Sequence, residues 1–337
     1  MTEKKHDVLT IGRSSIDLYS QNIGAPFNDI KGFDAFVGGS PLNIAVGCAR
    51  LGVNASLLSG VGDDKVGTFI LNFLENEGVN TQCISTIKGT RSSAVVLGIE
   101  PPDKFPLVYY RDNAADSQIT VEDVIKAKIN DYKIVLLNGT ALNIEPTRSA
   151  TFFAAEVADK NDIDVVLDLD FRADQWHDYR AFGLTIRALL SKVKIAIGTE
   201  EEILAATMSS TSQVTIKDQQ ISAPEIKGDI DSSIQQLLAL GIETLIVKKG
   251  SAGASIHYPD GSKKDVPGFP VEILNVLGAG DAFASGFLYG ILQGWDLYKS
   301  CRMGNASGAQ VVTKKGCANF MPYLNESMSF INERGGF

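Results

Sequence analysis

The segment LNVLGAGDAFASGFL, residues 274–288, decides how the chain is interpreted, because two glycines and an acid stand directly before a run of small and apolar residues. Gly278 and Gly280 let the backbone approach a ligand closely, since they carry no side chain. The run that follows predicts a helix over 279–293, whose first free N–H groups and dipole favour a phosphate. Asp281 lies in that first turn, where we expect the dipole to keep its carboxylate ionised.

An anion site beside an ionised carboxylate suits phosphoryl transfer, with the carboxylate accepting the proton of a hydroxyl. The dipole that keeps Asp281 charged also makes it a weak base, so we expect positioning and charge stabilisation to supply most of the rate. A helix that is merely capped by glycines and an acid is the alternative, and the segment alone does not exclude it.

A second glycine segment, VGGSPLNIA at residues 37–45, also precedes a predicted helix, over 42–51. Ser40 is the expected cap and Pro41 suits the first helical position, since it lacks an N–H. Gly38 and Gly39 again permit close backbone approach, and Asn43 offers two donors and an acceptor to sugar hydroxyls.

Short apolar strands alternate with helical patterns along most of the chain, which predicts an α/β fold with a mostly parallel sheet covered on both faces. We treat 1–337 as one domain. Two β-rich parts, 17–36 and 93–112, interrupt the alternation and are expected to form a small β-lid, the second around a Pro-Pro-Asp turn at 101–103. Segment 209–231 is polar, which predicts a mobile insertion.

The expected strands cover 8–11, 55–61, 134–137, 165–169, 194–197 and 244–247. The expected helices cover 42–51, 66–77, 148–160, 179–190, 201–207, 232–240 and 279–293.

Composition and missing motifs exclude several classes. The 337 residues carry a net charge of −9 and no long basic run, which disfavours nucleic acid as a partner. The longest stretch free of Asp, Glu, Lys and Arg, 35–49, is too short and too polar to span a membrane. The chain has no HExxH, GxSxG, CxxC or Walker A motif, and no GxGxxG follows the first strand, so zinc hydrolases, P-loop enzymes and NAD-dependent dehydrogenases are disfavoured. A cytoplasmic location is the default expectation.

Together the two glycine segments, with Gly52 and Gly62 in step, resemble the two signature regions of the PfkB (ribokinase-like) family of carbohydrate kinases. The resemblance covers essentially the whole chain. It implies a ribokinase-like three-layer α/β/α fold with a β-lid over the sugar, and ATP and Mg²⁺ as cosubstrate and metal. A homodimer that pairs through exposed lid strands is also compatible with it.

The resemblance also implies roles for individual residues. The catalytic base would be Asp281, with the amides of Gly278, Ala279 and Gly280 as the anion hole. Sugar contacts would come from Asp17, Gly38, Gly39 and Asn43, nucleotide contacts from Lys248, Gly250, Gly253 and Asn305, and a magnesium-linked acid from Glu200 or its neighbour Glu201. An acidic, solvated helix start is the alternative for these two glutamates.

The chain departs from the family at two places. Asn275-Val276 stands where many members have Asp-Thr, which leaves activation by a monovalent cation uncertain. Gly198-Thr199 replaces the family's Asn before the magnesium-linked acid.

Two arginines resemble those of the branch that phosphorylates sugar acids. Arg111, in VYYRDN, would hold a carboxylate or phosphate; a surface pairing with Asp112 or Asp116 is its alternative. Arg172, in DLDFR, would neutralise charge between the two substrates; an ion pair with Asp170 or Asp174 is its alternative. We therefore expect a sugar-acid kinase, with a ketohexose kinase and a non-catalytic sugar or nucleotide sensor as alternatives.

Overall fold

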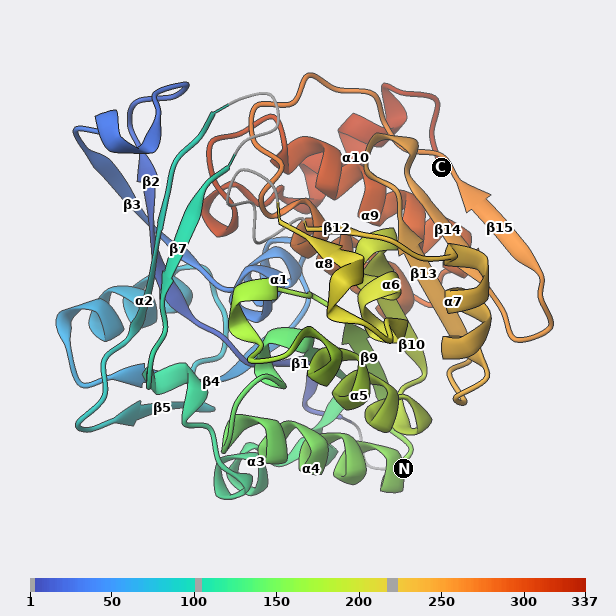
Figure 1. The fold of residues 1–337 in the computed structure, drawn as a ribbon, viewed down its shortest axis with the longest axis horizontal. Coiled ribbons are helices and arrows are strands. Elements are labelled where there is room, and N and C mark those ends of the chain that lie inside the picture. Colours follow the sequence, from blue (N-terminus) through green and yellow to red (C-terminus); the bar gives the residue numbers. More distant parts are fainter. Residues whose placement is uncertain (1–3, 101–104, 217–223) are drawn as a thin grey trace.

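A nine-stranded sheet runs through the computed structural model, which describes residues 4–100, 105–216 and 224–337 (Figure 1). Its strand order is β15-β14-β13-β10-β9-β8-β1-β4-β5. The strands from β13 to β5 pair in parallel, whereas β14 and β15 add an antiparallel edge. The strands are β1 (His6–Ile11), β4 (Ala55–Gly62), β5 (Ile84–Ile87), β8 (Tyr132–Asn138), β9 (Asp164–Asp168), β10 (Ile195–Thr199), β13 (Thr244–Lys248), β14 (Ala254–His257) and β15 (Lys263–Val266).

Helices cover both faces of this sheet. Along β8 the side chains alternate: Val135 and Leu137 belong to one buried cluster, and Ile134 and Leu136 to the other. The first cluster includes helices α3 (Val121–Ala127), α4 (Thr147–Lys160), α5 (Tyr179–Leu189), α6 (Glu200–Thr207) and α7 (Ile230–Leu238). The second includes α1 (Ser40–Arg50), α2 (Lys65–Asn76), α8 (Ala279–Leu292) and α9 (Leu297–Val311), and α10 (Leu324–Asn332) packs against α9. This confirms the three-layer α/β/α prediction.

A separate four-stranded sheet stands beside the body as a lid (Figure 1). Its order is β3-β2-β6-β7, with β2 and β6 parallel and the outer pairs antiparallel. The strands are β2 (Ser15–Ser20), β3 (Phe33–Gly38), β6 (Ser93–Leu97) and β7 (Leu107–Tyr110), within or next to the two predicted segments. The predicted turn at 101–103 lies outside the described residues. Apolar lid side chains pack against Cys317 of the body, so the lid is anchored over one edge of the main sheet.

Some elements differ from the prediction. The described ends of segment 209–231 form a two-stranded ribbon, β11 (Val214–Thr215) and β12 (Glu225–Ile226). Helix α1 begins at Ser40 itself and Gly39 is its cap, with a φ of 110°. A Cβ on Gly39 would lie 2.3 Å from the Arg13 carbonyl oxygen, so this position requires glycine.

The carboxyl ends of the parallel strands β1, β9, β10 and β13 meet the amino ends of α1 and α8 at one edge of the main sheet. Open α/β sheets bind ligands at this edge. None of the helices in the described part combines the length and the apolar character needed to cross a bilayer.

Candidate active site

The two glycine segments meet at the amino ends of α1 and α8. Asn43 Nδ2 donates a hydrogen bond of 2.7 Å to Asp281 Oδ2 across 238 positions of sequence. Ser40 also hydrogen-bonds to Asp281 and itself accepts a bond of 2.9 Å from Asn138 Nδ2. The carboxylate of Asp281 is therefore oriented by side chains of the other helix and of β8.

The 278–281 turn presents bare backbone to its surroundings. Gly278 caps α8 in the left-handed region, with a φ of 84°, and a Cβ there would lie 2.7 Å from Cys317 Sγ. A Cβ on Gly280 would lie 3.1 Å from Lys248 Nζ, so the lysine ammonium rests against the turn. In the described part of the chain the N–H groups of Gly280 and Asp281 donate to no other atom, whereas the Ala279 N–H donates to the Val276 carbonyl at 3.3 Å. Free N–H groups at a helix start are suited to an anion.

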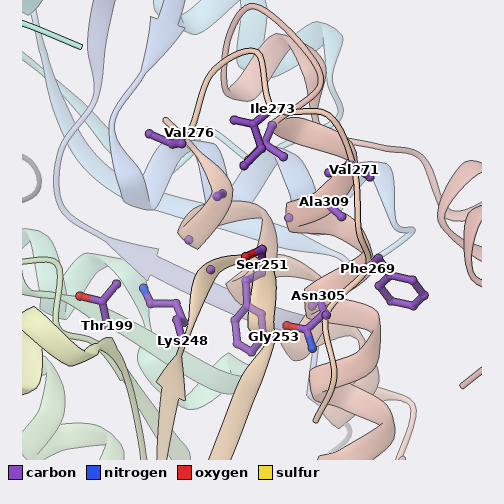
Figure 2. A pocket seen from close by; sticks show the side chains of 18 residues that line it. Thr199, Lys248, Ser251, Gly253, Phe269, Val271, Ile273, Val276, Asn305 and Ala309 are labelled. Atoms are coloured by element: carbon purple, nitrogen blue, oxygen red, sulfur yellow. The ribbon is translucent and has the colours of Figure 1, made fainter. Parts of the chain in front are cut away.

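A cavity of about 830 Å³, here the apolar cavity, opens on one side of the turn (Figure 2). Figure 2 shows Thr199 and Lys248 at one end, and Phe269, Val271 and Asn305 at the other. Gly250, Gly253 and Asn305, predicted nucleotide contacts, all line it. A cavity with apolar walls and an ammonium at one end suits an apolar ring system joined to an anionic group.

Two further cavities continue from the apolar cavity. The central cavity, about 840 Å³, shares Thr199, Lys248, Val276, Ala279 and Gly280 with it. The lid cavity, about 430 Å³, shares Arg172, Leu277, Gly278 and Asp281 with the central cavity. The three cavities therefore adjoin one another, and the 278–281 turn supplies residues to the walls that they share.

Burial changes the expectation for Asp281. Removal from water and the charge of Asp170 raise the pKa of Asp281, while hydrogen bonds from Asn43 and Ser40 and the charge of Arg172 lower it, with a net shift upward. Desolvation is thus the largest of these effects on the pKa of Asp281, and it acts against the weakly basic carboxylate expected from the helix dipole. A raised pKa makes Asp281 a better proton acceptor.

Lys248 holds a positive charge between the apolar and central cavities. Its Nζ lies 3.1 Å from Asp168 Oδ1 and 3.6 Å from Glu202 Oε2. Burial raises the pKa of Asp168 to about 7 although Lys248 lowers it, and the same acids hold the pKa of Lys248 above its usual value. This keeps an ammonium beside Gly280 at neutral pH.

The acids available for a metal differ from the leading prediction. Glu200 and Glu201 are both exposed, but Glu201 and the buried Glu202 line the central cavity and Glu200 does not. Glu202 accepts a 2.8 Å hydrogen bond from the Thr199 N–H, which leaves Glu201 as the carboxylate without a protein partner in the described part. No group of three or more His, Cys, Asp or Glu side chains suited to a metal occurs among the described residues. This donor set fits Mg²⁺ shared with phosphate oxygens and water, the usual arrangement for that ion.

The lid cavity contains the predicted sugar contacts Asp17 and Asn43. Asp17 is buried, accepts a 2.7 Å hydrogen bond from Ser15, and has its pKa raised by desolvation. A Cβ on Gly38 would overlap the Asp17 carboxylate, so glycine there makes room for the acid. Gly38 and Gly39, both predicted sugar contacts, are not among the residues that line this cavity; Gly38 affects it through the space it leaves for Asp17.

The structure places Arg111 in a buried ion pair with Asp116, away from the cavities, instead of the surface pairing that was the alternative. Arg111 Nε lies 2.7 Å from Asp116 Oδ2, and its Nη1 donates to the Thr140 carbonyl at 3.0 Å and to Gln175 Oε1 at 2.7 Å. It lines none of the three cavities. Arg111 therefore ties the end of lid strand β7 to loops of the body. Arg172 pairs with Asp170 at 2.6 Å, yet lines both the central and the lid cavity.

Asn275 is the residue that leaves activation by a monovalent cation uncertain. It is fully buried, its Nδ2 donates to the Lys315 carbonyl at 3.0 Å, and its Oδ1 accepts from the Leu277 N–H at 3.0 Å. The neutral side-chain amide of Asn275 thus holds the loop that precedes the 278–281 turn.

Sequence reasoning missed four side chains that line the lid cavity: Arg13, Tyr19, Tyr109 and Cys317. Arg13 lies two residues after the end of the apolar strand β1, and polar residues after a parallel strand are a signal for the ligand edge. Tyr19 and Cys317 contact each other at 3.0 Å, from the lid and the body, and no spacing in the sequence links them.

Comparison with known proteins agrees with this geometry. The model of the pfkB family carbohydrate kinases matches residues 5–324, and the chain belongs to this family of carbohydrate kinases. Among its relatives, the 5-dehydro-2-deoxygluconokinase of Clostridium tetani is 33% identical over 98% of this chain and 94% of its own. The enzyme of that name from Geobacillus thermodenitrificans is 31% identical over the same shares.

Solved structures show the same fold. A putative ribokinase II from E. coli in its apo form superposes with a TM-score of 0.84 at 22% identity, over 97% of this chain and 99% of its own. The fructokinase of Xylella fastidiosa with bound ATP gives a TM-score of 0.83 at 25% identity, over 98% and 99%. The ribokinase-like architecture predicted from the sequence is thereby confirmed.

Proposed function

We propose that this carbohydrate kinase transfers the γ-phosphoryl group of ATP to the C6 hydroxyl of 5-dehydro-2-deoxy-D-gluconate, a step of myo-inositol catabolism in the cytoplasm. The observation that carries the proposal is the set of three adjoining cavities, with Asp281 and the bare 278–281 turn among the residues that they share. The names of the 30–33% identical relatives support the choice of acceptor.

ATP would lie with its base in the apolar cavity and its phosphates in the central cavity, between the Lys248 ammonium and the Gly280 and Asp281 amides. The sugar acid would occupy the lid cavity with its hydroxyl at Asp281. Asp281 then accepts the hydroxyl proton as the oxygen attacks the γ-phosphorus in line, and Lys248, Arg172 and the amides stabilise the charge on the transferred group. The lid excludes water, which limits hydrolysis of ATP.

Mg²⁺ would be held by Glu201 together with the ATP phosphates and water, and it would neutralise phosphate charge.

Glu201 and Glu200 provide a matched pair, since they are adjacent acids on one helix and only Glu201 lines the central cavity. We expect Glu201→Gln to raise the Mg²⁺ concentration for half-maximal rate by about tenfold or more. Glu200→Gln should leave it within about twofold of wild type. A magnesium titration at fixed ATP checks this, and a larger effect at Glu200 would restore the original assignment.

The acceptor is tested by kcat/KM for 5-dehydro-2-deoxygluconate, 2-dehydro-3-deoxygluconate and fructose with MgATP. We expect the first to exceed the others by at least about tenfold, since each misplaced polar group in a closed site costs on the order of 1–3 kcal/mol. A preference for 2-dehydro-3-deoxygluconate or fructose would replace the proposed acceptor. Absence of turnover with every sugar would favour the sensor alternative. Pairing of two chains through the lid stays a prediction.

A further inference from the structure

Arg13 is a buried arginine that forms no ion pair with any residue that the structure describes. Its exposed fraction is 7%, and among the described residues no carboxylate lies within ion-pair distance of it. Its Nη1 donates to Ser15 Oγ at 2.9 Å, while its Nε is buried without any hydrogen-bond partner. Buried charges in proteins are normally paired, so this guanidinium lacks an anion.

The other enclosed arginines have carboxylate or carbonyl partners, although Nη2 of Arg111 is also buried without a hydrogen bond. Arg50, Arg111 and Arg172 each lie at 2.6–2.7 Å from a carboxylate. Arg302 donates to the carbonyls of residues 267, 268 and 336 and stacks on the Phe269 ring at 3.8 Å. The contrast singles out Arg13, which is held over the Tyr109 ring at 5.1 Å and faces the lid cavity.

The position of Arg13 separates it from the reacting end of the site. Arg172 and Asp281 line both the central and the lid cavity, but Arg13 lines the lid cavity alone. Ser15 accepts a hydrogen bond from Arg13 and itself donates one to Asp17. The carboxylate of Asp17 is therefore linked to Arg13 only through the Ser15 hydroxyl, and it does not bind the guanidinium directly. Because Arg13 lines the lid cavity and not the central cavity, its guanidinium lies away from the side on which ATP would bind.

We propose that Arg13 is the residue that selects an acidic acceptor, by binding the sugar carboxylate at the end of the molecule remote from the phosphorylated hydroxyl. This inference rests on the proposed function and assigns its acid specificity to Arg13 in place of Arg111. A guanidinium suits the task because its planar fork donates two parallel hydrogen bonds to a carboxylate.

The test compares the sugar acid with its neutral counterpart, in which the carboxylate is a hydroxymethyl group, on wild type, Arg13→Gln and Arg13→Lys. We expect Arg13→Gln to lower the ratio of kcat/KM for acid over neutral sugar by about 100-fold or more, because a buried charge loses its partner. Arg13→Lys should recover part of the ratio, since it keeps the charge without the fork. The KM for ATP should stay within about twofold.

Arg148→Gln is the matched control, since Arg148 lies on α4 outside all three cavities and should not change the ratio. The melting temperature of Arg13→Gln should equal or exceed that of wild type, because an unpaired buried charge is removed. If wild type prefers the acid and Arg13→Gln lowers kcat/KM equally for both sugars, the proposed function stands and the proposed role of Arg13 is wrong. If wild type prefers the neutral sugar, both the acid function and the role of Arg13 fail.

Discussion

Replacing Asp281 with Asn is expected to lower kcat by about 10²- to 10⁴-fold, the range that a positioned general base supplies. Asn keeps the shape of the side chain and can still accept the hydrogen bond from Asn43, but it cannot take a proton from the sugar hydroxyl. The raised pKa of Asp281 strengthens the expectation, because the stronger base contributes more to the rate. A coupled assay of ADP release with saturating sugar acid and MgATP measures the effect.

The variant should still bind ATP, because the apolar cavity is lined by other residues. We expect the dissociation constant for ATP to stay within about threefold of wild type and the melting temperature to be no lower. A variant that binds ATP normally and turns over within threefold of wild type would remove Asp281 from the mechanism.

Arg111→Ala is expected to lower the free energy of unfolding by about 3–5 kcal/mol, the typical cost of leaving one member of a buried ion pair alone. Asp116 is fully buried and Arg111 has 7% side-chain exposure, so Ala would leave the carboxylate without its cation. The change also releases the contacts of Arg111 to the loops at Thr140 and Gln175, which fix the base of the lid. Denaturant unfolding measures the loss.

Arg148→Ala supplies the comparison, because its pair with Glu145 is partly exposed on both sides and should be worth less than about 1 kcal/mol. In the kinetic assay Arg111→Ala should affect acid and neutral sugars alike. A normal unfolding free energy together with a selective loss of the sugar acid would return Arg111 to the substrate.

The layered fold could be predicted because many of its strands and helices have a recognisable local sequence pattern. A short segment is enough to show the side-chain pattern of an apolar strand, such as 8–11 or 134–137. A short segment also shows the glycine geometry that marks the helix starts at 40 and 279. The antiparallel edge β14–β15 and helix α9 were not predicted. β15 is mostly polar and α9 includes Gly304 and Gly308, so neither shows the expected period, and packing decides both.

The centre of the site was predictable for the same reason, since the 278–281 turn and Asn43 belong to contiguous motifs. Its periphery was not, because the partner of a charged side chain depends on three-dimensional neighbours. Sequence alone does not distinguish Arg111 from Arg13, yet Arg111 pairs with Asp116 whereas Arg13 hydrogen-bonds to Ser15 and lies over the Tyr109 ring. Glu200 and Glu201 differ by 100° around a helix, and only the second faces the central cavity.

The central claim is that the 278–281 turn receives the transferred phosphoryl group beside Asp281. A crystal structure with a non-hydrolysable ATP analogue, Mg²⁺ and 5-dehydro-2-deoxygluconate tests it most directly. We expect the γ-phosphate oxygens to accept hydrogen bonds from the Gly280 and Asp281 amides, and the acceptor hydroxyl to lie about 2.5–3.0 Å from the Asp281 carboxylate. A terminal phosphorus bound away from this turn, or a sugar hydroxyl facing another base, would contradict the account.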